Sequence, residues 1–401
     1  RAFTGRPLAA RRRFLYARGG HFSLPVLSRH MTFPAPSPAA CRTRQQRLLA
    51  RMQERNVELA IITSHAHVQW LAGPYYSSKF QPAAALRSNG HLTVVVPSRK
   101  PDPLLQETAD EILTYDAQWH STLRNDQRKA SSEVLARAIA NWTQKANVGV
   151  EFSTVGMHLS ERLTRAAVDL EPDLFHLRRR KDADELAMLR HAIAATGKMY
   201  ERARKIVRPG MNELDVFSEL QAVAVRHFGE PTTDTGNDYA ANARGGPPRD
   251  RNAQAGELYI LDLGPAYRGY YSDTCRTLAV DRKPTAEQQA AWAAIVPVFD
   301  LIQSTVRPGV RCREIFERCQ KLLDKAPHGK FDHHLGHGFG LFPHEAPHLN
   351  PYWDDTFEPG DTFTVEPGLY APNLQAGIRL ENDYLVTETG VQLLSDFHLE
   401  L

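Results

Sequence analysis

An internal repeat in the second half of the sequence constrains the fold more than any other feature. The segment VRPGMNELDVFSELQ from Val207 returns as VRPGVRCREIFERCQ from Val306, and each copy predicts a turn followed by a helix. A second pair follows in the same order, GELYILDLG from Gly256 and GDTFTVEPG from Gly360. Repetition at this spacing implies two related half-domains that bring like positions together at a shared axis.

Four carboxylates stand at matched positions in the two copies. Asp262 falls opposite Glu366, and Asp273 has Glu381 as its counterpart at a slightly longer offset. Each lies in a strand-like run, where a carboxylate is costly to bury unless it is paired or coordinates a cation. One such acid alone is more often a salt-bridged surface residue. Four of them in matched, strand-embedded positions favour a common cation site.

Five histidines fall within twenty residues, in FDHHLGHGFGLFPHEAPHLN from Phe331 to Asn350. Such a cluster indicates metal binding or proton transfer, with a His-rich surface loop as the alternative. Four carboxylates and one imidazole form an anionic site that needs about two divalent cations, and the ligand set suits Mn²⁺, Co²⁺, Fe²⁺ or Zn²⁺. Because paired metals lower the pKa of a shared water, the expected chemistry is hydrolysis.

Composition excludes several other classes of protein. The formal net charge is +3, but residues 1–30 carry seven arginines and no lysine or acid, so the remainder is mildly acidic and no nucleic-acid partner is expected. No run approaches the ~18 apolar residues that a membrane span needs. The four cysteines lack CxxC spacing and predict neither a disulfide framework nor a cysteine zinc site. A cytoplasmic location is therefore expected.

The sequence from residue 43 to residue 178 alternates between helical and strand-like patterns. RQQRLLARMQERNV and SSEVLARAIANWTQKA predict helices, whereas LAIITS, LTVVVPS and NVGVEF predict strands. We therefore predict an α/β domain over residues 43–178 and a catalytic domain over residues 179–401. The basic run LRRRK at the junction is interpreted as a solvated hinge surface, and Asp182 as the N-cap of a long helix.

The Arg-rich leader, residues 1–42, is expected to lie outside the fold. Residues 1–30 are free of acids and rich in arginine, as transit peptides are. The alternative is a true start at Met31, just before the Pro- and Ser-rich TFPAPSPAA. Either explanation leaves the fold to begin near residue 43.

Four segments together resemble the pita-bread metallohydrolases, a family that includes prolidase, aminopeptidase P, methionine aminopeptidase and the metal-free creatinase. The segments are LDLGPAYRGYYSDTCRT, HHLGHGFGLFPHEAP, VEPGLY and IRLEND. The resemblance covers residues 43–401 and implies an α/β N-terminal domain followed by an α+β pita-bread catalytic domain with an internal pseudo-twofold repeat. It also implies two divalent metal ions, with Mn²⁺ or Co²⁺ favoured over Zn²⁺ or Fe²⁺. The implied metal ligands are Asp262, Asp273, His337, Glu366 and Glu381, with Asp273 and Glu381 bridging.

Other residues take expected roles from the same resemblance. His344 matches the histidine that contacts the substrate and assists proton movement, and His333 matches an outer histidine near the substrate, so both are expected catalytic and substrate-binding residues. Arg379 matches an arginine that orients a ligand carboxylate. His334 and His348 have no matched role, and local hydrogen bonds are expected for them.

One loop departs from the pattern of the peptidases. They carry a further histidine before the first aspartate, whereas this chain has no histidine between residues 228 and 327. Asn242 or Arg244, in the loop DTGNDYAANARGGPPRD, would take its place, and Arg244 is counted among the expected substrate-binding residues. Asn382 stands where the family usually has a second acid. The departure weakens the peptidase reading but leaves the metal site intact.

The motifs predict an Xaa-Pro dipeptidase or aminopeptidase that cleaves small peptides. Glu366 would take up the proton of the attacking water, and His344 would help to stabilise the tetrahedral intermediate. A hydrolase or lyase of the same fold acting on a small non-peptide metabolite is one alternative, and a non-catalytic binding module is another. The resemblance also implies a homodimer. A small peptide or amide-like substrate is expected, and neither nucleic acid nor membrane is an expected partner.

Overall fold

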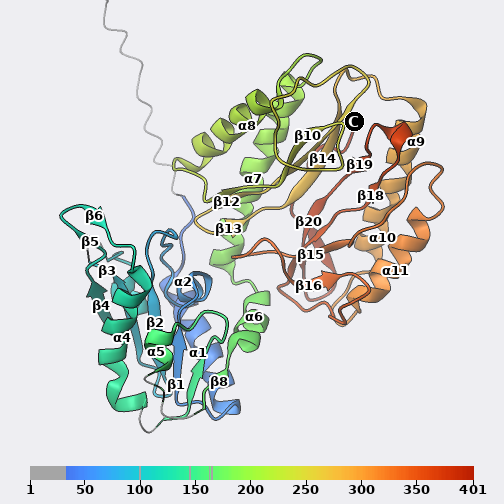
Figure 1. Cartoon of the computed structure of the whole chain (residues 1–401). Coiled ribbons are helices and arrows are strands. Elements are labelled where there is room, and N and C mark those ends of the chain that lie inside the picture. The colour runs from blue at the N-terminus through green and yellow to red at the C-terminus, as the bar shows by residue number, and fades with distance from the viewer. Residues whose placement is uncertain (1–32, 99–100, 144–145, 162, 164–165) are drawn as a thin grey trace, which may run out of the picture. The chain divides into compact units, whose positions relative to one another are not determined.

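The computed structural model describes residues 33–401 except 99–100, 144–145, 162 and 164–165 (Figure 1). The expectations for residues 1–30, a transit peptide or a start at Met31, fall outside the described part. Helix α1 (Pro38–Glu54) begins after Ser37, whose hydroxyl accepts a hydrogen bond from the Ala40 N–H. Proline suits the first position of a helix because its missing N–H would have no partner there. The fold therefore begins earlier than residue 43, and the expected boundary lies inside α1.

A mixed six-stranded sheet forms the centre of the N-terminal region (Figure 1). Its strand order is β4-β3-β2-β1-β7-β8, with β1 antiparallel to β2 and parallel to β7. The strands of this region are β1 (Leu59–Ile62), β2 (Ala83–Arg87), β3 (Leu92–Pro97), β4 (Glu111–Tyr115), β5 (Gln118–Trp119), β6 (Thr122–Leu123), β7 (Val148–Val150) and β8 (Val168–Asp169). The helices after α1 are α2 (His65–Ala72), α3 (Leu105–Thr108), α4 (Gln127–Thr143), α5 (Met157–Ser160) and α6 (Glu171–Arg179). Each helix and strand predicted here is confirmed.

Helices cover both faces of this sheet. Successive residues of a strand point to opposite faces, and apolar residues on both faces pack against helices. Ala60 belongs to the same apolar core as Leu48 of α1, whereas Leu59 and Ile61 share a second core with Leu135 of α4. The expected α/β architecture of the N-terminal region is confirmed.

The chain after residue 182 builds antiparallel sheets flanked by helices. A five-stranded sheet has the order β16-β15-β17-β20-β21, two three-stranded sheets have the orders β10-β11-β14 and β13-β12-β9, and a two-stranded sheet consists of β18 and β19. The helices are α7 (Ala183–Ile206), α8 (Glu213–Phe228), α9 (Ala286–Ile295), α10 (Pro297–Thr305) and α11 (Cys312–Leu323), with a 3₁₀ turn η1 (Pro372–Leu374). The strands are β9 (Asp234–Thr235), β10 (Asp238–Ala241), β11 (Leu258–Leu263), β12 (Pro265–Tyr267), β13 (Tyr270–Tyr271), β14 (Thr274–Ala279), β15 (Gly336–Gly338), β16 (Glu345–Leu349), β17 (Thr362–Val365), β18 (Gly368–Leu369), β19 (Ile378–Arg379), β20 (Asn382–Val386) and β21 (Val391–Leu393).

The sequence repeat is present in the structure as two matching turns. Gly210 and Gly309 have φ angles of +86° and +85°, a conformation that favours glycine. Their N–H groups donate to the carbonyls of Ala253 and Phe357 respectively, each at 2.8 Å. α8 follows the first turn and α11 follows the second. The predicted turn followed by a helix is confirmed in both copies.

The basic run between α6 and α7 does not form a solvated hinge surface, so that interpretation is wrong. Arg178, Arg179 and Lys181 are only 4%, 6% and 6% exposed. Each is paired with a carboxylate, which is what makes burying a cation tolerable. Arg179, for example, contacts both oxygens of the fully buried Asp361 at 2.9 and 2.7 Å. Asp182 is the N-cap of α7, as predicted.

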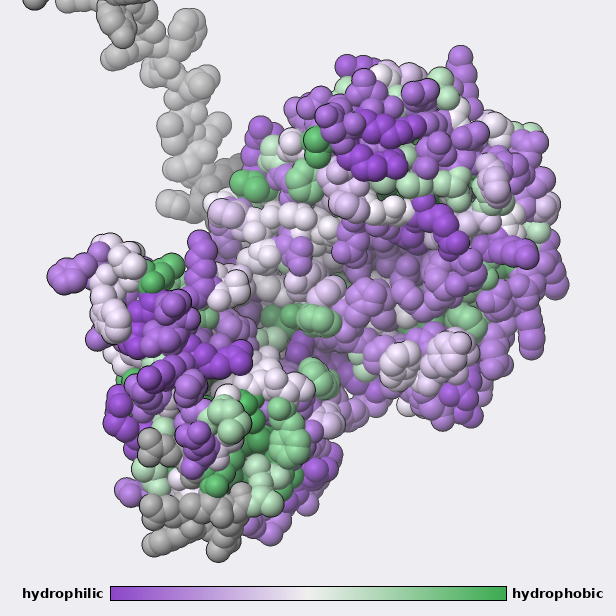
Figure 2. All heavy atoms as spheres, in the orientation of Figure 1, coloured by the Kyte–Doolittle hydropathy of each residue, from purple (hydrophilic) through white to green (hydrophobic). Residues whose placement is uncertain are grey.

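The outer surface adds two observations. Hydrophilic residues dominate the face of the second half of the chain in Figure 2, whereas hydrophobic atoms gather over part of the N-terminal region. None of the helices in the described part of the chain combines the length and the apolar character that crossing a bilayer requires.

Residues 34–401 form one compact unit, and the division into domains at residue 178 stays a prediction.

Candidate metal centre

A cavity of ≈ 300 Å³ in the C-terminal region gathers every site residue that was predicted from the sequence. Its lining consists of Asn237, Asp238, Arg244, Asp262, Asp273, His333, His334, His337, His344, Glu366, Tyr370, Arg379 and Glu381. Apart from Tyr370, all of these side chains are strongly polar or charged. Such a lining suits cations and polar ligands better than apolar ones.

The two halves of the repeat bring the four carboxylates together. Asp262 lies on β11, and Asp273 directly precedes the neighbouring strand β14. Glu366 directly follows β17, and Glu381 directly precedes β20. The Glu381 N–H donates to the Cys275 carbonyl at 2.9 Å, which connects the second half to the first. The acids therefore converge because the strands that carry them do.

Burial and mutual repulsion dominate the electrostatics of these acids. Asp262, Asp273 and Glu381 are 7%, 6% and 1% exposed. Burial and the neighbouring carboxylates raise the pKa of Asp262 to about 6, although Arg379 opposes the shift. Burial and nearby acids also raise the pKa of Asp273 and Glu381 well above their ordinary values. Without additional positive charge, the cavity would keep protons on some of its carboxyl groups near neutral pH.

Arg379 supplies positive charge on one side of the cavity. Its Nη2 donates to Asp262 Oδ2 at 2.8 Å and also to Asp238. Its Nη1 donates to the Tyr370 hydroxyl at 3.3 Å and to the Arg244 carbonyl at 3.1 Å. A guanidinium held by this many partners can fix the orientation of a carboxylate, as expected for Arg379.

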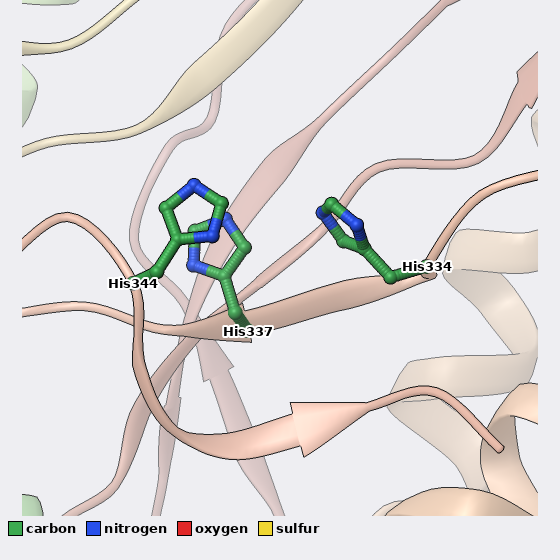
Figure 3. Close-up of side chains that lie close together, drawn as sticks. All are labelled: His334, His337 and His344. Atoms are coloured by element: carbon green, nitrogen blue, oxygen red, sulfur yellow. The ribbon is translucent and has the colours of Figure 1, made fainter. Parts of the chain in front are cut away.

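Three histidines that line the cavity lie close together, with the rings of His337 and His344 side by side and His334 turned towards them (Figure 3). His337 lies on β15, His344 on the loop before β16, and His334 just before β15. The rings of His337 and His344 are stacked, with centroids 3.7 Å apart and planes 13° apart. Burial lowers the pKa of His337 to about 4, although Glu366 opposes the shift. His337 is therefore neutral near pH 7, which is the form that binds a cation.

Glu366 lies beside histidines, whereas neighbouring carboxylates raise the pKa of the other three acids. His334 Nε2 lies 2.6 Å from Glu366 Oε1, and His337 Nε2 lies 3.6 Å from the same oxygen. Burial alone would raise the pKa of Glu366, but the His334 hydrogen bond and the neighbouring imidazoles bring it to about 2. In return, Glu366 raises the pKa of His334 against the effect of burial. Glu366 is thus an ionised carboxylate over the whole neutral range.

The donor set of the cavity fits divalent cations. Asp262 Oδ1 and Glu381 Oε2 are buried without a hydrogen-bond partner among the described residues. Ligand atoms of Asp273, His337 and Glu381 all lie within 4.8 Å of one another. A buried acceptor that lacks a donor is costly, and a bound cation would satisfy it. Carboxylate oxygens with an imidazole suit Mn²⁺, Co²⁺, Fe²⁺ or Zn²⁺.

Two glycines let β15 carry His337 between its neighbouring strands. A Cβ on Gly336 would lie 2.0 Å from the Thr364 carbonyl oxygen on β17. A Cβ on Gly338 would lie 2.1 Å from the Ala346 carbonyl oxygen on β16. Any other residue would push the strands apart, so the position of His337 depends on both glycines.

The loop that lacks the histidine of the peptidases brings Arg244 to the cavity but leaves Asn242 out of its lining. The Arg244 guanidinium lies 4.1 Å from the centroid of the Tyr370 ring and forms an ion pair with Asp332. The backbone N–H of Asn242 donates to the Leu258 carbonyl at 2.8 Å. Of the two alternatives, only Arg244 is placed where a ligand in the cavity would meet it.

His333 also lines the cavity, but protein groups engage both of its ring nitrogens. Nε2 lies 3.0 Å from the Tyr370 hydroxyl, and Nδ1 lies 2.7 Å from the His334 carbonyl. His348 lies outside this lining and bonds to Asp355 at 2.8 Å, so its expected local hydrogen bond is confirmed.

Comparison with known proteins agrees with this geometry. The model of metallopeptidase family M24 matches residues 187–388, which is half of the chain. The chain belongs to metallopeptidase family M24. The model of the creatinase/prolidase N-terminal domain matches residues 44–179 of this M24 protein. The resemblance to pita-bread metallohydrolases and the fold that it implies are thereby confirmed.

Two relatives with sequence similarity are named as peptidases. An uncharacterized peptidase of Staphylococcus epidermidis is 31% identical over 234 residues, which cover 57% of this chain and 66% of the relative. An uncharacterized peptidase of Staphylococcus aureus is 29% identical over 235 residues, with the same two shares. The match thus spans slightly less than two thirds of these relatives.

Solved structures share the fold over most of the chain. An Xaa-Pro dipeptidase from Bacillus anthracis has a TM-score of 0.77 at 22% identity, covering 90% of this chain and 99% of that one. Prolidase from Pyrococcus furiosus has a TM-score of 0.72 at 21% identity, covering 87% and 99%. An X-Pro aminopeptidase from Thermotoga maritima also has a TM-score of 0.72, at 20% identity, covering 89% and 98%.

Sequence reasoning missed four cavity residues of this M24 protein, Asn237, Asp238, His334 and Tyr370. His334 was expected to form only local hydrogen bonds, which is wrong, because it bonds to Glu366 across 32 residues of sequence. Its spacing of three residues from His337 in HHLGH was the available signal. Asp238 and Tyr370 carried no such signal, since only the folded strands bring both of them to Arg379.

Proposed function

We propose that this M24 protein is a dinuclear-metal-dependent hydrolase of the Xaa-Pro dipeptidase or aminopeptidase type that cleaves small peptides. The observation that carries the proposal is the buried cavity of four carboxylates and His337, with two oxygens that lack partners in the described chain. Structures of the same fold are named Xaa-Pro dipeptidase, prolidase and X-Pro aminopeptidase, which supports the substrate class.

Five side chains would hold the two metal ions in this proposal. Each half of the repeat contributes carboxylates, and the ligands are Asp262, Asp273, His337, Glu366 and Glu381. The resemblance to the pita-bread metallohydrolases implies that Asp273 and Glu381 would be the ligands shared by the two ions, and the ligand atoms of these two residues lie within 4.8 Å of each other. Mn²⁺ or Co²⁺ is favoured, and Zn²⁺ or Fe²⁺ also fits the oxygen-rich set.

The divalent ions would polarise the scissile carbonyl and make a bound water more acidic. Glu366 is ionised and accepts the proton of the attacking water, while the His334 hydrogen bond keeps its carboxylate oriented. His344 faces the cavity and stabilises the negative charge that develops on the substrate oxygen. His333 contributes to the wall that contacts the substrate.

A peptidase assay with controlled metal content tests this function. Chelator-treated protein should be inactive towards Xaa-Pro dipeptides and Xaa-Pro-Xaa tripeptides, and Mn²⁺ or Co²⁺ should restore turnover. The ratio of the two rates separates a dipeptidase from an aminopeptidase. Full activity after metal removal would refute the metal-dependent mechanism. Binding of the peptides without any turnover would instead indicate a non-catalytic module.

Arg244 favours a second candidate, a hydrolase or lyase for a small non-peptide metabolite. It occupies the cavity wall on the loop that carries a histidine in the peptidases, and a guanidinium recognises carboxylate or phosphate groups. A substrate with an anionic leaving group would suit this position better than a plain dipeptide.

Substitution of Arg244 separates the two candidates. If a non-peptide anion is the true substrate, Arg244→Ala should reduce its kcat/KM by ~10² or more and leave slow Xaa-Pro cleavage nearly unchanged. Asp332→Asn is the matched control, because it removes the partner of Arg244 and keeps the guanidinium. Rapid Xaa-Pro turnover, with kcat/KM above about 10⁵ M⁻¹s⁻¹ in both variants, would restore the dipeptidase function.

Two further expectations stay predictions, the homodimer and the cytoplasmic location. Light scattering on the purified protein measures the first, and fractionation of cells tests the second.

A further inference from the structure

We propose that Arg178 is a positioning residue for His344 and that it acts through Glu345. The proposal rests on the catalytic role of His344 in the proposed function. The proposal gives the N-terminal region a part in catalysis, although none of its described residues lines the four-carboxylate cavity.

Glu345 directly follows His344 and closes the turn that carries it. The Phe342 N–H donates to Glu345 Oε1 at 3.0 Å, so the carboxylate spans Pro343 and His344. Arg178 donates to the same oxygen, and Lys181 Nζ donates to Oε2 at 3.1 Å. The charge-assisted bonds that the described residues give this carboxylate come from Arg178 at the end of α6 and from Lys181 between α6 and α7.

The three charged side chains of this cluster are largely buried, and Arg178 and Glu345 also line a neighbouring cavity of ≈ 410 Å³. The side chains of Arg178, Lys181 and Glu345 are 4%, 2% and 10% exposed. A Cβ on Gly340 would lie 2.9 Å from Lys181 Cε and 3.1 Å from Glu345 Oε2, so the ion pair lies directly against the backbone of the loop. A displacement of Glu345 would therefore displace the loop and, with it, His344.

Arg178 is itself anchored in the N-terminal region. Its Nη1 donates to His67 Nε2 at 3.0 Å, and because arginine has no acceptor, the His67 proton resides on Nδ1. His67 Nδ1 donates in turn to the fully buried Glu151, which also accepts the Ser64 N–H at 2.8 Å. The chain of bonds runs from α2 and the end of β7 through Arg178 to Glu345.

The next residue offers a comparison within the same helix turn. Arg179 is as deeply buried as Arg178 and is also paired with a buried carboxylate, but its partners are Asp361, Glu358 and the Thr356 carbonyl. None of these belongs to the loop that carries His344. A general loss of stability should thus follow from substitution of either arginine, whereas a loss of positioning should follow only from substitution of Arg178.

Three variants of the full-length, metal-loaded protein test the proposal. Arg178→Met removes the bond to Glu345, Arg178→Lys keeps the charge but cannot reach both partners, and Arg179→Met is the matched control. We expect Arg178→Met to lower kcat for Xaa-Pro cleavage by at least ~10-fold with KM changed less than about 3-fold, because the site is misaligned rather than lost. Arg178→Lys should recover part of kcat. Arg179→Met should lower the melting temperature while the folded protein keeps its kcat.

Glu345→Gln provides a second route if Arg178→Met does not fold. The amide keeps the size of the side chain and its acceptor for the Phe342 N–H, but it loses the charge that attracts Arg178 and Lys181. We expect the same fall in kcat as for Arg178→Met. An unchanged kcat in Glu345→Gln, or an equal fall in Arg179→Met, would overturn the proposal.

The NMR signal of the His344 ring gives a readout that does not need activity. In metal-free, ¹³C-histidine-labelled protein, where no paramagnetic ion broadens it, this signal is assigned by its loss in His344→Gln, and it should shift or broaden in Arg178→Met and stay in place in Arg179→Met. If the wild-type protein cleaves no Xaa-Pro peptide, the proposed function fails, and the ring signal still decides the positioning. An unmoved His344 signal in Arg178→Met would refute the positioning even in an active enzyme.

Discussion

Asp262 and Glu366 stand at equivalent positions of the repeat but meet opposite electrostatic surroundings. Burial and other carboxylates raise the pKa of Asp262 to about 6, whereas His334 and His337 bring that of Glu366 to about 2 despite its burial. A carboxyl group is thus protonated more readily in one half, whereas its counterpart in the other half is ionised at neutral pH before it accepts a proton in the proposed reaction. The largest contribution to the low pKa of Glu366 is its hydrogen bond with His334 at 2.6 Å, and His337 adds to it.

Replacement of Glu366 by glutamine should abolish most of the activity. The variant keeps the shape of the side chain but loses the proposed proton acceptor and one proposed metal ligand. We expect kcat to fall by at least ~10². Glu358→Gln, a change at a glutamate whose side chain is 42% exposed, is the control and should retain wild-type rates. Wild-type turnover in Glu366→Gln would rule out its assigned role.

The role of a single residue could be predicted where its side chain stands out from the local hydrophobic pattern of the sequence. Asp262 interrupts an apolar strand, and that conflict reveals it without any tertiary information. Arg178 was expected to be exposed, because a run of basic residues is normally solvated. Its partner Glu345 lies 167 residues away in the sequence, and no local pattern could indicate that pairing.

At the scale of elements, β15 decides where His337 lies in the four-carboxylate cavity. It lies between β16 and β17, and its register with β16 shifts between His337 and Gly338. The sequence shows Gly336 and Gly338 but not why they are needed. A Cβ at these positions would meet the carbonyl groups of Thr364 and Ala346, which only the folded structure brings close. The helices and strands of the N-terminal region were easier to predict, since their apolar periodicity is local.

Substitution of Gly336 by alanine should damage both the fold and the metal site. The added Cβ would lie 2.0 Å from the Thr364 carbonyl oxygen, a contact that forces β15 and β17 apart. We expect a lower melting temperature and weaker Mn²⁺ binding by calorimetry. Gly156→Ala is the control, because the nearest atom to its Cβ would be the flexible Arg128 side chain at 3.3 Å. Equal metal affinity in Gly336→Ala and the wild type would show that β15 tolerates the displacement.

At the scale of the whole molecule, the four-carboxylate cavity makes stability depend on pH and metal. The pKa of Asp262 is about 6 in the folded protein, above the ~3.9 of an unfolded aspartate. A group with a raised folded-state pKa adds stability that is complete below the unfolded pKa and is lost as the pH rises through the folded pKa. The free energy of unfolding of the metal-free protein should therefore fall between about pH 4 and pH 7, and bound cations should prevent this cost in stability.

Urea unfolding of chelator-treated protein measures this cost. Between about pH 4.5 and pH 7.5, the wild type should lose on the order of 2 kcal/mol relative to Asp262→Asn, which cannot ionise at that position. Mn²⁺ should abolish the difference in pH dependence by stabilising the ionised cavity. If the free energy of unfolding changes with pH in the same way in the metal-free wild type and in metal-free Asp262→Asn, then Asp262 ionises as easily in the folded protein as in the unfolded chain.

Calorimetric titration of Mn²⁺ into the metal-free protein tests the central claim most directly. The wild type should bind two ions per chain in a saturable manner, because two halves of the repeat contribute carboxylates to one cavity. Glu381→Gln, which removes a proposed bridging ligand with an unpartnered buried oxygen, should bind one ion or none. Absence of saturable binding in the wild type, or two ions bound unchanged by Glu381→Gln, would contradict the assignment of this cavity as a dinuclear metal centre.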